Sequence, residues 1–520
     1  MIRSAYLVTI PKVSFRSFRS VIRSKARAVA LAAIALSVFH AKAVAAANPA
    51  PETGLPAVIV KASGKASGNQ AAKLGPAYSY RKGGWTYVHL EGSPADVGYQ
   101  HGYLLAAEIE DMYQVLKLEN THETKRDWEF FREASQKMLW PHIEAEYQQE
   151  LEGIAKGLQA KGSKLDVWDI VAMNAGIELP QYYVPWLNKR EHASNAPHIS
   201  APGNCSAFIA TGSFTKGGKI VIAHNNWSSY ADGARWTIIF DIQPARGHRM
   251  LMDGVPGVIT SQDDFGVNDA GMMVTETTIT QFVGWDPDGV PEFVRSRKAL
   301  QYATSVDEYA KLIREGNNGG YANDWLIGDR KTGEIAYLEL GLKNTPMWHT
   351  KDGYYVSSNF ARDPKLIADE TEGFKLDDLS SSPNARRITA EKRIERAKGR
   401  IDIEMAEQFL SDHEDSYSGK VEADGRSLCG HIDADPRGVP VWDLGPYDPF
   451  GAVTGKVADS DTAGRMSLVA HAGHPCGEDF LAAPFLKAHP EYDYLKPILK
   501  DMKAGPWTTF VAGEKGAVAQ

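Results

Sequence analysis

The pattern of hydrophobic and polar positions changes character near residue 205. Upstream, apolar residues recur at helical spacing, as in the stretch 126–161, where Tyr147, Leu151, Ile154 and Leu158 fall on one face. Downstream, apolar and β-branched residues form short runs separated by turn residues, which is typical of strands. The pattern predicts a mainly helical segment followed by a β-rich one.

The predicted elements follow this division. We expect helices over residues 94–116, 126–161, 167–179, 292–302, 306–315, 385–398, 403–410 and 494–502. We expect strands over residues 85–90, 207–211, 219–224, 236–243, 257–262, 271–279, 324–329, 334–340 and 353–359. Ser93 before Pro94 predicts a helix start, and the turn at 329–334 predicts a hairpin. Runs of strands between runs of helices favour antiparallel sheets packed under helices over alternating βαβ units.

A polar stretch ends where the β-rich part begins. Residues 188–204 offer no apolar face, which predicts an exposed loop suited to proteolysis. Cys205 follows directly and opens an apolar run, and after a turn at Gly217 and Gly218 a second run ends at His224. This predicts a β-hairpin whose first residue is a thiol.

The N-terminal 47 residues have their own pattern. A basic region without acids precedes an apolar run of 12 residues at 28–39, and small residues follow at 43–47. We interpret residues 1–47 as a secretory signal peptide, with an Arg-rich organelle-targeting peptide as the weaker alternative. Residues 48–76, rich in Ala, Gly, Pro, Ser and Lys, are predicted to be a disordered leader. We therefore expect an exported protein, periplasmic or secreted, with no integral membrane segment in the mature chain.

Composition and charge exclude some functions. The 520 residues are 43% hydrophobic, as in globular proteins. Loss of residues 1–47, which carry eight Lys and Arg and no acid, changes the formal charge from −8 to about −16. Nucleic-acid binding needs basic patches, so we expect no nucleic-acid partner.

We divide the chain beyond the leader into two segments, residues 77–204, which are mainly helical, and residues 205–520. We expect the two segments to form one composite domain.

The chain has three cysteines. In an exported protein two of them can pair, and Cys429 and Cys476, close together in the C-terminal region, are the candidate disulfide. Cys205 is then the odd thiol. The alternative is that all three are reduced and buried.

A thiol at this place suggests one kind of chemistry. Cys205 opens a strand and lacks the helix N-terminus signature of papain-like proteases. Cleavage of the Asn204–Cys205 bond would place a free α-amine beside the thiol, and an amine with a pKa of about 8 can act as the general base. We therefore expect Cys205 to be both nucleophile and new N-terminus.

Several motifs in order carry a family resemblance. They are NCSAF at 204–208, HNNWSSY at 224–230, PGVITSQDDF at 256–265, GMMVTETTI at 271–279, YANDW at 321–325, SSN at 357–359 and SPNARR at 382–387, with GSPADVGYQHG at 92–102, ELEGIA at 150–155 and NAGIE at 174–178 upstream. Over residues 80–510 the chain resembles the phospholipase B-like proteins and, more distantly, the penicillin acyltransferase (peptidase C45) group. The resemblance implies an α+β fold, the four-layer αββα sandwich of two antiparallel sheets found in N-terminal nucleophile hydrolases.

The resemblance also implies site residues. They are the nucleophile Cys205, His224 and Trp227 lining the thiol pocket, Asn226 binding substrate, Thr278 hydrogen-bonding near the nucleophile, Asn359 donating to the oxyanion, and an arginine that is Arg387 or Arg386. The segment around 382–387 is shifted from the family pattern, which leaves the choice of arginine open. Asp263 and Asp264 are interpreted as turn residues.

No cofactor or metal is expected. His471, His474 and Cys476 have spacings that occur in zinc sites, but no second Cys/His cluster in the sequence completes four ligands.

The sequence thus predicts an exported, self-processing hydrolase of acyl ester or amide bonds that acts on a small-molecule acyl substrate, a lipid or an N-acyl amide. Two alternatives stay open. One is an acyltransferase or peptide or β-lactam-type amidase of the C45 group, and the other is a catalytically silent binding protein of the same fold.

Overall fold

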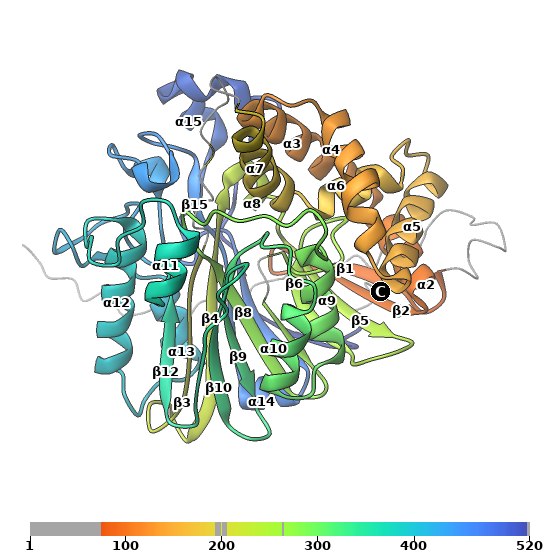
Figure 1. Ribbon diagram of the computed structural model, residues 1–520. Helices are drawn as coiled ribbons and strands as arrows, with labels where there is room; N and C mark the ends of the chain where they lie inside the picture. Colours follow the sequence, from red (N-terminus) through yellow and green to blue (C-terminus); the bar gives the residue numbers. More distant parts are fainter. Residues whose placement is uncertain (1–73, 193–198, 200–204, 263–264, 517–520) are drawn as a thin grey trace, which may run out of the picture. The chain divides into compact units, whose positions relative to one another are not determined.

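Two large β-sheets carry the fold (Figure 1), in a computed structural model that describes residues 74–192, 199, 205–262 and 265–516. The first has nine strands in the order β1-β2-β5-β6-β7-β8-β9-β10-β11, and the second six in the order β12-β3-β4-β15-β16-β17. The first contains β1 (Tyr78–Lys82), β2 (Trp85–Gly92), β5 (Ile238–Pro244), β6 (Met250–Gly254), β7 (Gly266–Asn268), β8 (Met272–Thr278), β9 (Asn323–Asp329), β10 (Glu334–Leu340) and β11 (Met347–Thr350). The second contains β12 (Gly353–Ser357), β3 (Cys205–Gly212), β4 (Gly218–Ser229), β15 (Phe450–Asp459), β16 (Ser467–Ala472) and β17 (Thr508–Val511).

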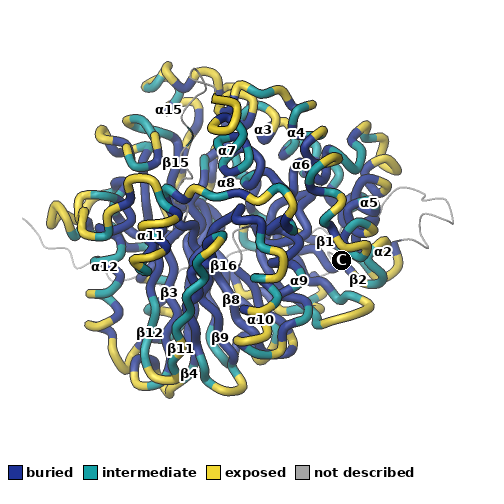
Figure 2. The backbone as a smooth tube through the Cα atoms, viewed as in Figure 1, coloured by how far each residue is buried: buried dark blue, intermediate teal, exposed yellow. Residues whose placement is uncertain are grey.

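Alternation along the strands gives each sheet two buried faces. In β3, Ala207 and Ile209 join a core cluster that also takes residues from the nine-stranded sheet, whereas Phe208 and Ala210 join a cluster shared with helices. Side chains alternate with period two, so the two faces of β3 contribute to different core clusters. Figure 2 shows the strands in the buried interior and most exposed segments on helices and loops.

Helices cover the outward faces of both sheets. The N-terminal helices are α2 (Pro94–Leu104), α3 (Ala106–Thr124), α4 (Trp128–Ala134), α5 (Ala145–Ala160), α6 (Val167–Asn174) and α7 (Val184–Arg190). The later ones are α8 (Tyr230–Gly233), α9 (Glu292–Tyr302), α10 (Val306–Arg314), α11 (Pro364–Glu370), α12 (Ser382–Arg396), α13 (Ile403–Leu410), α14 (Ser460–Gly464) and α15 (Ala482–Ala488). Helices α9 and α10 contribute to the cluster with the nine-stranded sheet, and α13 packs on β4 and β15 of the other.

Glycines bring α2 and α5 into close contact. A Cβ added at Gly98 or Gly102 of α2 would lie 1.9 or 2.0 Å from a backbone carbonyl oxygen of α5, and one at Gly157 would lie 2.3 Å from the Tyr99 carbonyl oxygen. These distances are far below van der Waals contact, so only glycine allows this separation of the two helices.

We expect Gly98→Ala to lower the free energy of unfolding by about 2–3 kcal/mol, because the two helices must separate. Chemical denaturation of the purified protein measures this. Lys156→Ala, exposed on α5 and paired with Glu152, is the matched control and should change stability by less than about 0.5 kcal/mol. A Gly98→Ala change no larger than the control would contradict the close-packing account.

Several predicted elements are confirmed. Helices at 292–302 and 403–410 and the strand at 334–340 have the predicted bounds, β9 and β10 form the predicted hairpin, and β3 and β4 form the hairpin that begins at the thiol. Ser93 caps α2, accepting a hydrogen bond from the Asp96 backbone N–H.

Other predictions were wrong. The helix over 94–116 breaks at Leu105, and that over 126–161 breaks around Pro141, which cannot donate a backbone hydrogen bond. Residues 257–262 form no strand, and 494–502 no α-helix; a 3-10 helix ends at Leu495 instead. The sheets are not wholly antiparallel, because β2 and β5 run parallel.

Other sequence predictions were incomplete or fall outside the structure. Strands β1, β6, β7 and β11 had not been predicted. The signal peptide, almost all of the leader, Asp263, Asp264 and the Asn204 side of the cleavage bond lie outside the described residues. Helix α7 extends to Arg190, into the start of the stretch predicted as a loop.

Candidate active site

Cys205 is the first residue of β3 and is 1% exposed. The register of the β3–β4 hairpin places it opposite Asn226 and places Ala207 opposite His224. The Cys205 Sγ, a ring nitrogen of His224 and a carboxylate oxygen of Glu276 all lie within 4.8 Å of one another. The hairpin therefore brings an imidazole to the thiol, and β8 supplies a buried carboxylate that had not been predicted.

The backbone amide of Cys205 is held by Asn359. The Cys205 N–H donates to Asn359 Oδ1 at 3.2 Å, and Asn359 Nδ2 donates to the Thr278 carbonyl oxygen at 3.0 Å. Asn359 has φ 70°, a left-handed conformation that Asn tolerates better than most residues. The side chain predicted to donate to an oxyanion thus contacts the nitrogen that cleavage would free as an amine.

Arg386 binds the carbonyl group of Cys205 and contacts Asn359 as well. Its Nη1 donates to the Cys205 carbonyl oxygen at 2.5 Å and to Ser206 Oγ at 3.0 Å, and its Nη2 donates to Asn359 Oδ1 at 2.9 Å. The guanidinium lies 4.3 Å from the ring centroid of Trp227. Burial lowers the pKa of Arg386 to about 9, so the group is still charged at neutral pH. The structure places a buried positive charge beside the candidate nucleophile.

The structure separates the two arginines that the sequence left open. Arg387 contacts Glu391 at 3.5 Å and the Leu376 carbonyl oxygen at 3.4 Å, whereas Arg386 holds Cys205. Successive residues of α12 point in different directions, so only one of the pair faces the thiol.

Thr278 belongs to a buried hydrogen-bond chain next to the thiol. Thr278 Oγ1 donates to Tyr321 Oη at 2.7 Å, and Tyr321 Oη donates to Glu276 Oε1 at 3.3 Å. Burial, followed by the charges of Glu276 and Cys205, raises the pKa of Tyr321 well above its usual value. Neither Tyr321 nor Glu276 had been predicted, although a carboxylate within an otherwise uncharged strand was a signal for Glu276.

Asn226 and Trp227, two and three residues after His224, complete the surroundings of Cys205. Asn226 is 1% exposed, and its Nδ2 has no hydrogen-bond partner among the described residues. Trp227 donates through Nε1 to the Leu428 carbonyl oxygen at 3.3 Å and meets Trp442 edge to face, with ring centroids 6.0 Å apart. Asn226 therefore offers a buried amide donor next to Cys205 in the strand ladder.

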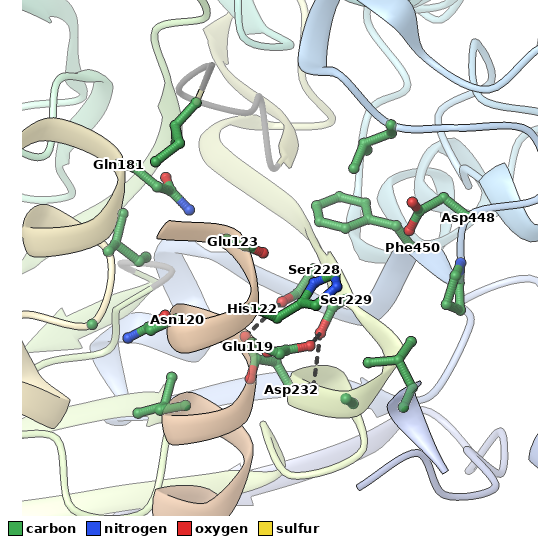
Figure 3. Close-up of a pocket in the computed structure, with 18 of the residues that line it drawn as sticks. Glu119, Asn120, His122, Glu123, Gln181, Ser228, Ser229, Asp232, Asp448 and Phe450 are labelled. Atoms are coloured by element: carbon green, nitrogen blue, oxygen red, sulfur yellow. Dashed lines mark hydrogen bonds between the residues drawn. The ribbon is translucent and has the colours of Figure 1, made fainter. Parts of the chain in front are cut away.

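The structure also contains a cavity of about 390 Å³, which is shown in Figure 3. Its lining combines apolar side chains, among them Met112, Leu116, Trp236 and Phe450, with carboxylates. Cys205 is not among the lining residues, but Trp442, which packs on Trp227, is. Trp442 therefore connects the cavity lining to Trp227, over which the Arg386 guanidinium lies.

The carboxylates of the cavity are hard to ionise. Burial raises the pKa of Glu123 and of Asp448 to about 7 and that of Asp232 to about 6, and it also raises the pKa of Glu119. Glu119 accepts a hydrogen bond from Ser229 Oγ at 2.8 Å (Figure 3). The cavity thus gains negative charge as the pH rises from about 5 to about 8.

The candidate disulfide is not formed. Cys429 and Cys476 are both free thiols in the structure. Both approach His431, with Sγ–Nε2 distances of 3.6 and 3.5 Å respectively.

Among the described residues, no helix has the length and apolar character needed to cross a bilayer.

Comparison with known proteins finds a family match over part of the chain. The family model for phospholipase B matches residues 96–337, a range that contains Cys205, His224 and Glu276. Over these residues the chain is similar to the phospholipase B family.

Similar curated proteins include phospholipase B-like proteins. Putative phospholipase B-like 2 of Mus musculus is 30% identical over 165 residues, which cover 28% of this chain and 26% of that protein. Phospholipase B-like protein C of Dictyostelium discoideum is 25% identical over 201 residues, 35% of each. An uncharacterized protein of Archaeoglobus fulgidus is 24% identical over 305 residues, 55% of this chain and 48% of that protein. The matched part thus spans half or less of each of these relatives.

Among solved structures, a mutant of the conjugated bile acid hydrolase from Clostridium perfringens matches with a TM-score of 0.30 and 12% identity. The match covers 51% of this chain and 89% of that one.

Proposed function

We propose that this protein is an exported, self-processing hydrolase of acyl ester or amide bonds, with Cys205 as its N-terminal nucleophile. One observation carries the proposal. The backbone nitrogen of Cys205 is bound by Asn359, its carbonyl oxygen is bound by Arg386, and its thiol lies within 4.8 Å of His224 and Glu276 donor atoms. The shared core between two sheets covered by helices supports the four-layer αββα arrangement of N-terminal nucleophile hydrolases.

In the proposed maturation, the Cys205 thiol attacks the carbonyl carbon of Asn204. The C–N bond breaks, the nitrogen takes a proton, and a thioester to Asn204 forms. Water then hydrolyses the thioester, releasing the Asn204 carboxylate and the Cys205 thiol. The new α-amine stays within reach of Asn359 Oδ1, which binds the same nitrogen at 3.2 Å before cleavage.

In the proposed catalytic cycle, the α-amine takes the thiol proton and the thiolate attacks the substrate carbonyl carbon. The oxyanion of the tetrahedral intermediate is stabilised by a preorganised donor, and Asn226, opposite Cys205 in the strand pair, has a buried amide Nδ2 without a hydrogen-bond partner among the described residues. The leaving alcohol or amine departs with the proton from the α-ammonium. Water, deprotonated by the amine, then hydrolyses the acyl-enzyme thioester and regenerates the thiol.

The cavity suggests the substrate class. Apolar side chains suit an acyl chain, and the carboxylates favour a substrate part that carries an amino or quaternary ammonium group. The family points to a lipid-like substrate. Ile199, six residues before Cys205, also lines the cavity, so we expect cleavage to change access to it.

We expect the preference for cationic substrates to increase with pH, because Glu123, Asp232 and Asp448 lose protons between about pH 5 and 8. The measurement is kcat/KM for a choline lysophospholipid divided by kcat/KM for a neutral acyl ester of equal chain length. This ratio should rise about three- to tenfold from pH 5.5 to 8. Asp448→Asn should flatten the rise, and a ratio that falls with pH would contradict the assignment.

The acyltransferase alternative is tested in the same assay. Added amine acceptor would divert the acyl group from free acid to amide if an amine, not water, resolves the acyl-enzyme. A product that stays free acid at high acceptor concentration supports hydrolysis.

A further inference from the structure

We propose that His413, Cys429, His431 and Cys476 form a structural zinc site, separate from the site at Cys205. One donor atom of each residue lies within 4.8 Å of all the others. Two thiols and two imidazoles are a common ligand set for structural Zn²⁺. The four residues come from the segment between α13 and β15 and from the turn after β16, so the chain converges here from two places.

The distances fit a tetrahedral ion. With Zn–S of about 2.3 Å and Zn–N of about 2.0–2.1 Å, a sulfur and a nitrogen bound to one tetrahedral zinc lie about 3.6 Å apart. His431 Nε2 lies 3.6 Å from Cys429 Sγ and 3.5 Å from Cys476 Sγ. Both sulfur–nitrogen distances therefore match this value.

The neighbouring groups fit a metal ligand set as well. The Nε2 atom of His413 is buried without a hydrogen-bond partner among the described residues. On the far side of the His431 ring, Asp433 Oδ1 lies 3.9 Å from Nδ1 and accepts a hydrogen bond from Tyr230 Oη at 2.5 Å. Carboxylates behind metal-bound imidazoles orient the ring. Neither apolar packing nor a disulfide between the two cysteines would require an unpartnered imidazole nitrogen or a carboxylate behind the second imidazole.

The sequence expectation of no metal considered the wrong histidines. His474 uses Nδ1 to contact the Ala452 carbonyl oxygen at 2.5 Å, and the His471 ring packs against Trp507, with centroids 5.1 Å apart. Of that motif, Cys476 is the residue that joins the cluster. The other three members of the cluster, His413, Cys429 and His431, lie 45 to 63 positions before Cys476 in the sequence. Sequence spacing alone therefore did not connect them to Cys476.

The position of the cluster gives the ion a structural role. The segment between α13 and β15 has little regular structure, only the two-residue strands β13 (Glu414–Asp415) and β14 (Lys420–Val421) and short 3-10 helices. Cys429 and Trp442, both in this segment, share a core cluster with Trp227. Trp442 also lines the cavity and donates to Thr280 Oγ1 at 2.8 Å. A zinc ion would fix the segment that forms one wall of the substrate cavity.

A disulfide between Cys429 and Cys476 is the competing occupant of the same place. It requires the two sulfurs to approach to about 2.05 Å, and it uses neither imidazole. The structure has both thiols free and two imidazoles close to the sulfurs. These observations favour the metal.

The test measures metal and thiols in the full-length purified protein, prepared without chelator. We expect about one zinc per chain by elemental analysis, and three titratable thiols after denaturation with a chelator. Cys429→Ser and Cys476→Ser should each lose the zinc. Cys205→Ser, which removes a thiol outside the cluster, should keep it, so the result does not depend on processing or activity.

A second measurement covers variants that fail to fold. Wild-type protein stripped of metal should bind one Co²⁺ per chain and show the visible and thiolate charge-transfer absorption of tetrahedral cobalt. Zinc-free protein that does not take up Zn²⁺ or Co²⁺, or a single titratable thiol with the other two in a disulfide, would overturn the proposal.

Discussion

Cys205→Ala will abolish acyl hydrolysis and leave the chain uncut. Alanine cannot attack the Asn204 carbonyl, so no α-amine is freed, and it cannot form an acyl-enzyme with substrate. The nucleophile, its base and the oxyanion donor act as a unit, so loss of the nucleophile removes most of the rate enhancement. We therefore expect kcat/KM to fall by roughly 10⁴-fold or more. Hydrolysis of an acyl ester and gel analysis of the same preparation measure both effects.

The matched control for this variant lies on the same strand. Thr211→Ser, at the far end of β3, should leave processing and kcat/KM within about twofold of wild type. Thermal unfolding of Cys205→Ala checks that the fold is intact. Wild-type activity in a folded Cys205→Ala variant would remove Cys205 from the mechanism and place the chemistry at another site.

Arg386→Lys will lower kcat/KM by about 100-fold. The guanidinium donates to three acceptors around Cys205 and lies over Trp227, and a lysine ammonium cannot reproduce this planar arrangement. The carbonyl oxygen of Cys205 and Asn359 would lose the group that fixes them. The charge survives in this variant, so the expected loss comes from geometry. Steady-state kinetics measures it.

Arg387→Lys is the control that the sequence itself provides. Arg387 contacts Glu391 and the Leu376 carbonyl oxygen, so the kcat/KM of this variant should stay within about threefold of wild type. Equal losses in the two variants would contradict the assignment of Arg386, and a larger loss at Arg387 would reverse it.

Local sequence patterns predicted individual helices and strands, but not the pairing of strands that are distant in the sequence. A mainly apolar run predicted β10, and period-3.6 runs predicted α9 and α13, because these segments are long enough for a pattern to be recognised. Strands β6 and β7 are only three to five residues long, which is too short for a pattern to stand out. The parallel pairing of β2 with β5 joins residues about 150 positions apart, and no local pattern encodes it.

The sequence predicted those site residues that are close together along the chain or that face each other across a hairpin. His224 reaches Cys205 because the two strands share a tight turn, and that turn was visible as Gly217 and Gly218. Glu276 and Tyr321 come from β8 and from the approach to β9, and their approach to the thiol depends on how the sheets meet. The same limit hid His413 and His431, which approach Cys476 only in the folded chain.

The most direct test of self-processing at Cys205 is the mass and N-terminal sequence of the purified mature protein on a denaturing separation. Self-processing predicts two fragments, the C-terminal one beginning with Cys205. A single chain that runs uncut through position 205, or a C-terminal fragment that begins at another residue, would contradict it.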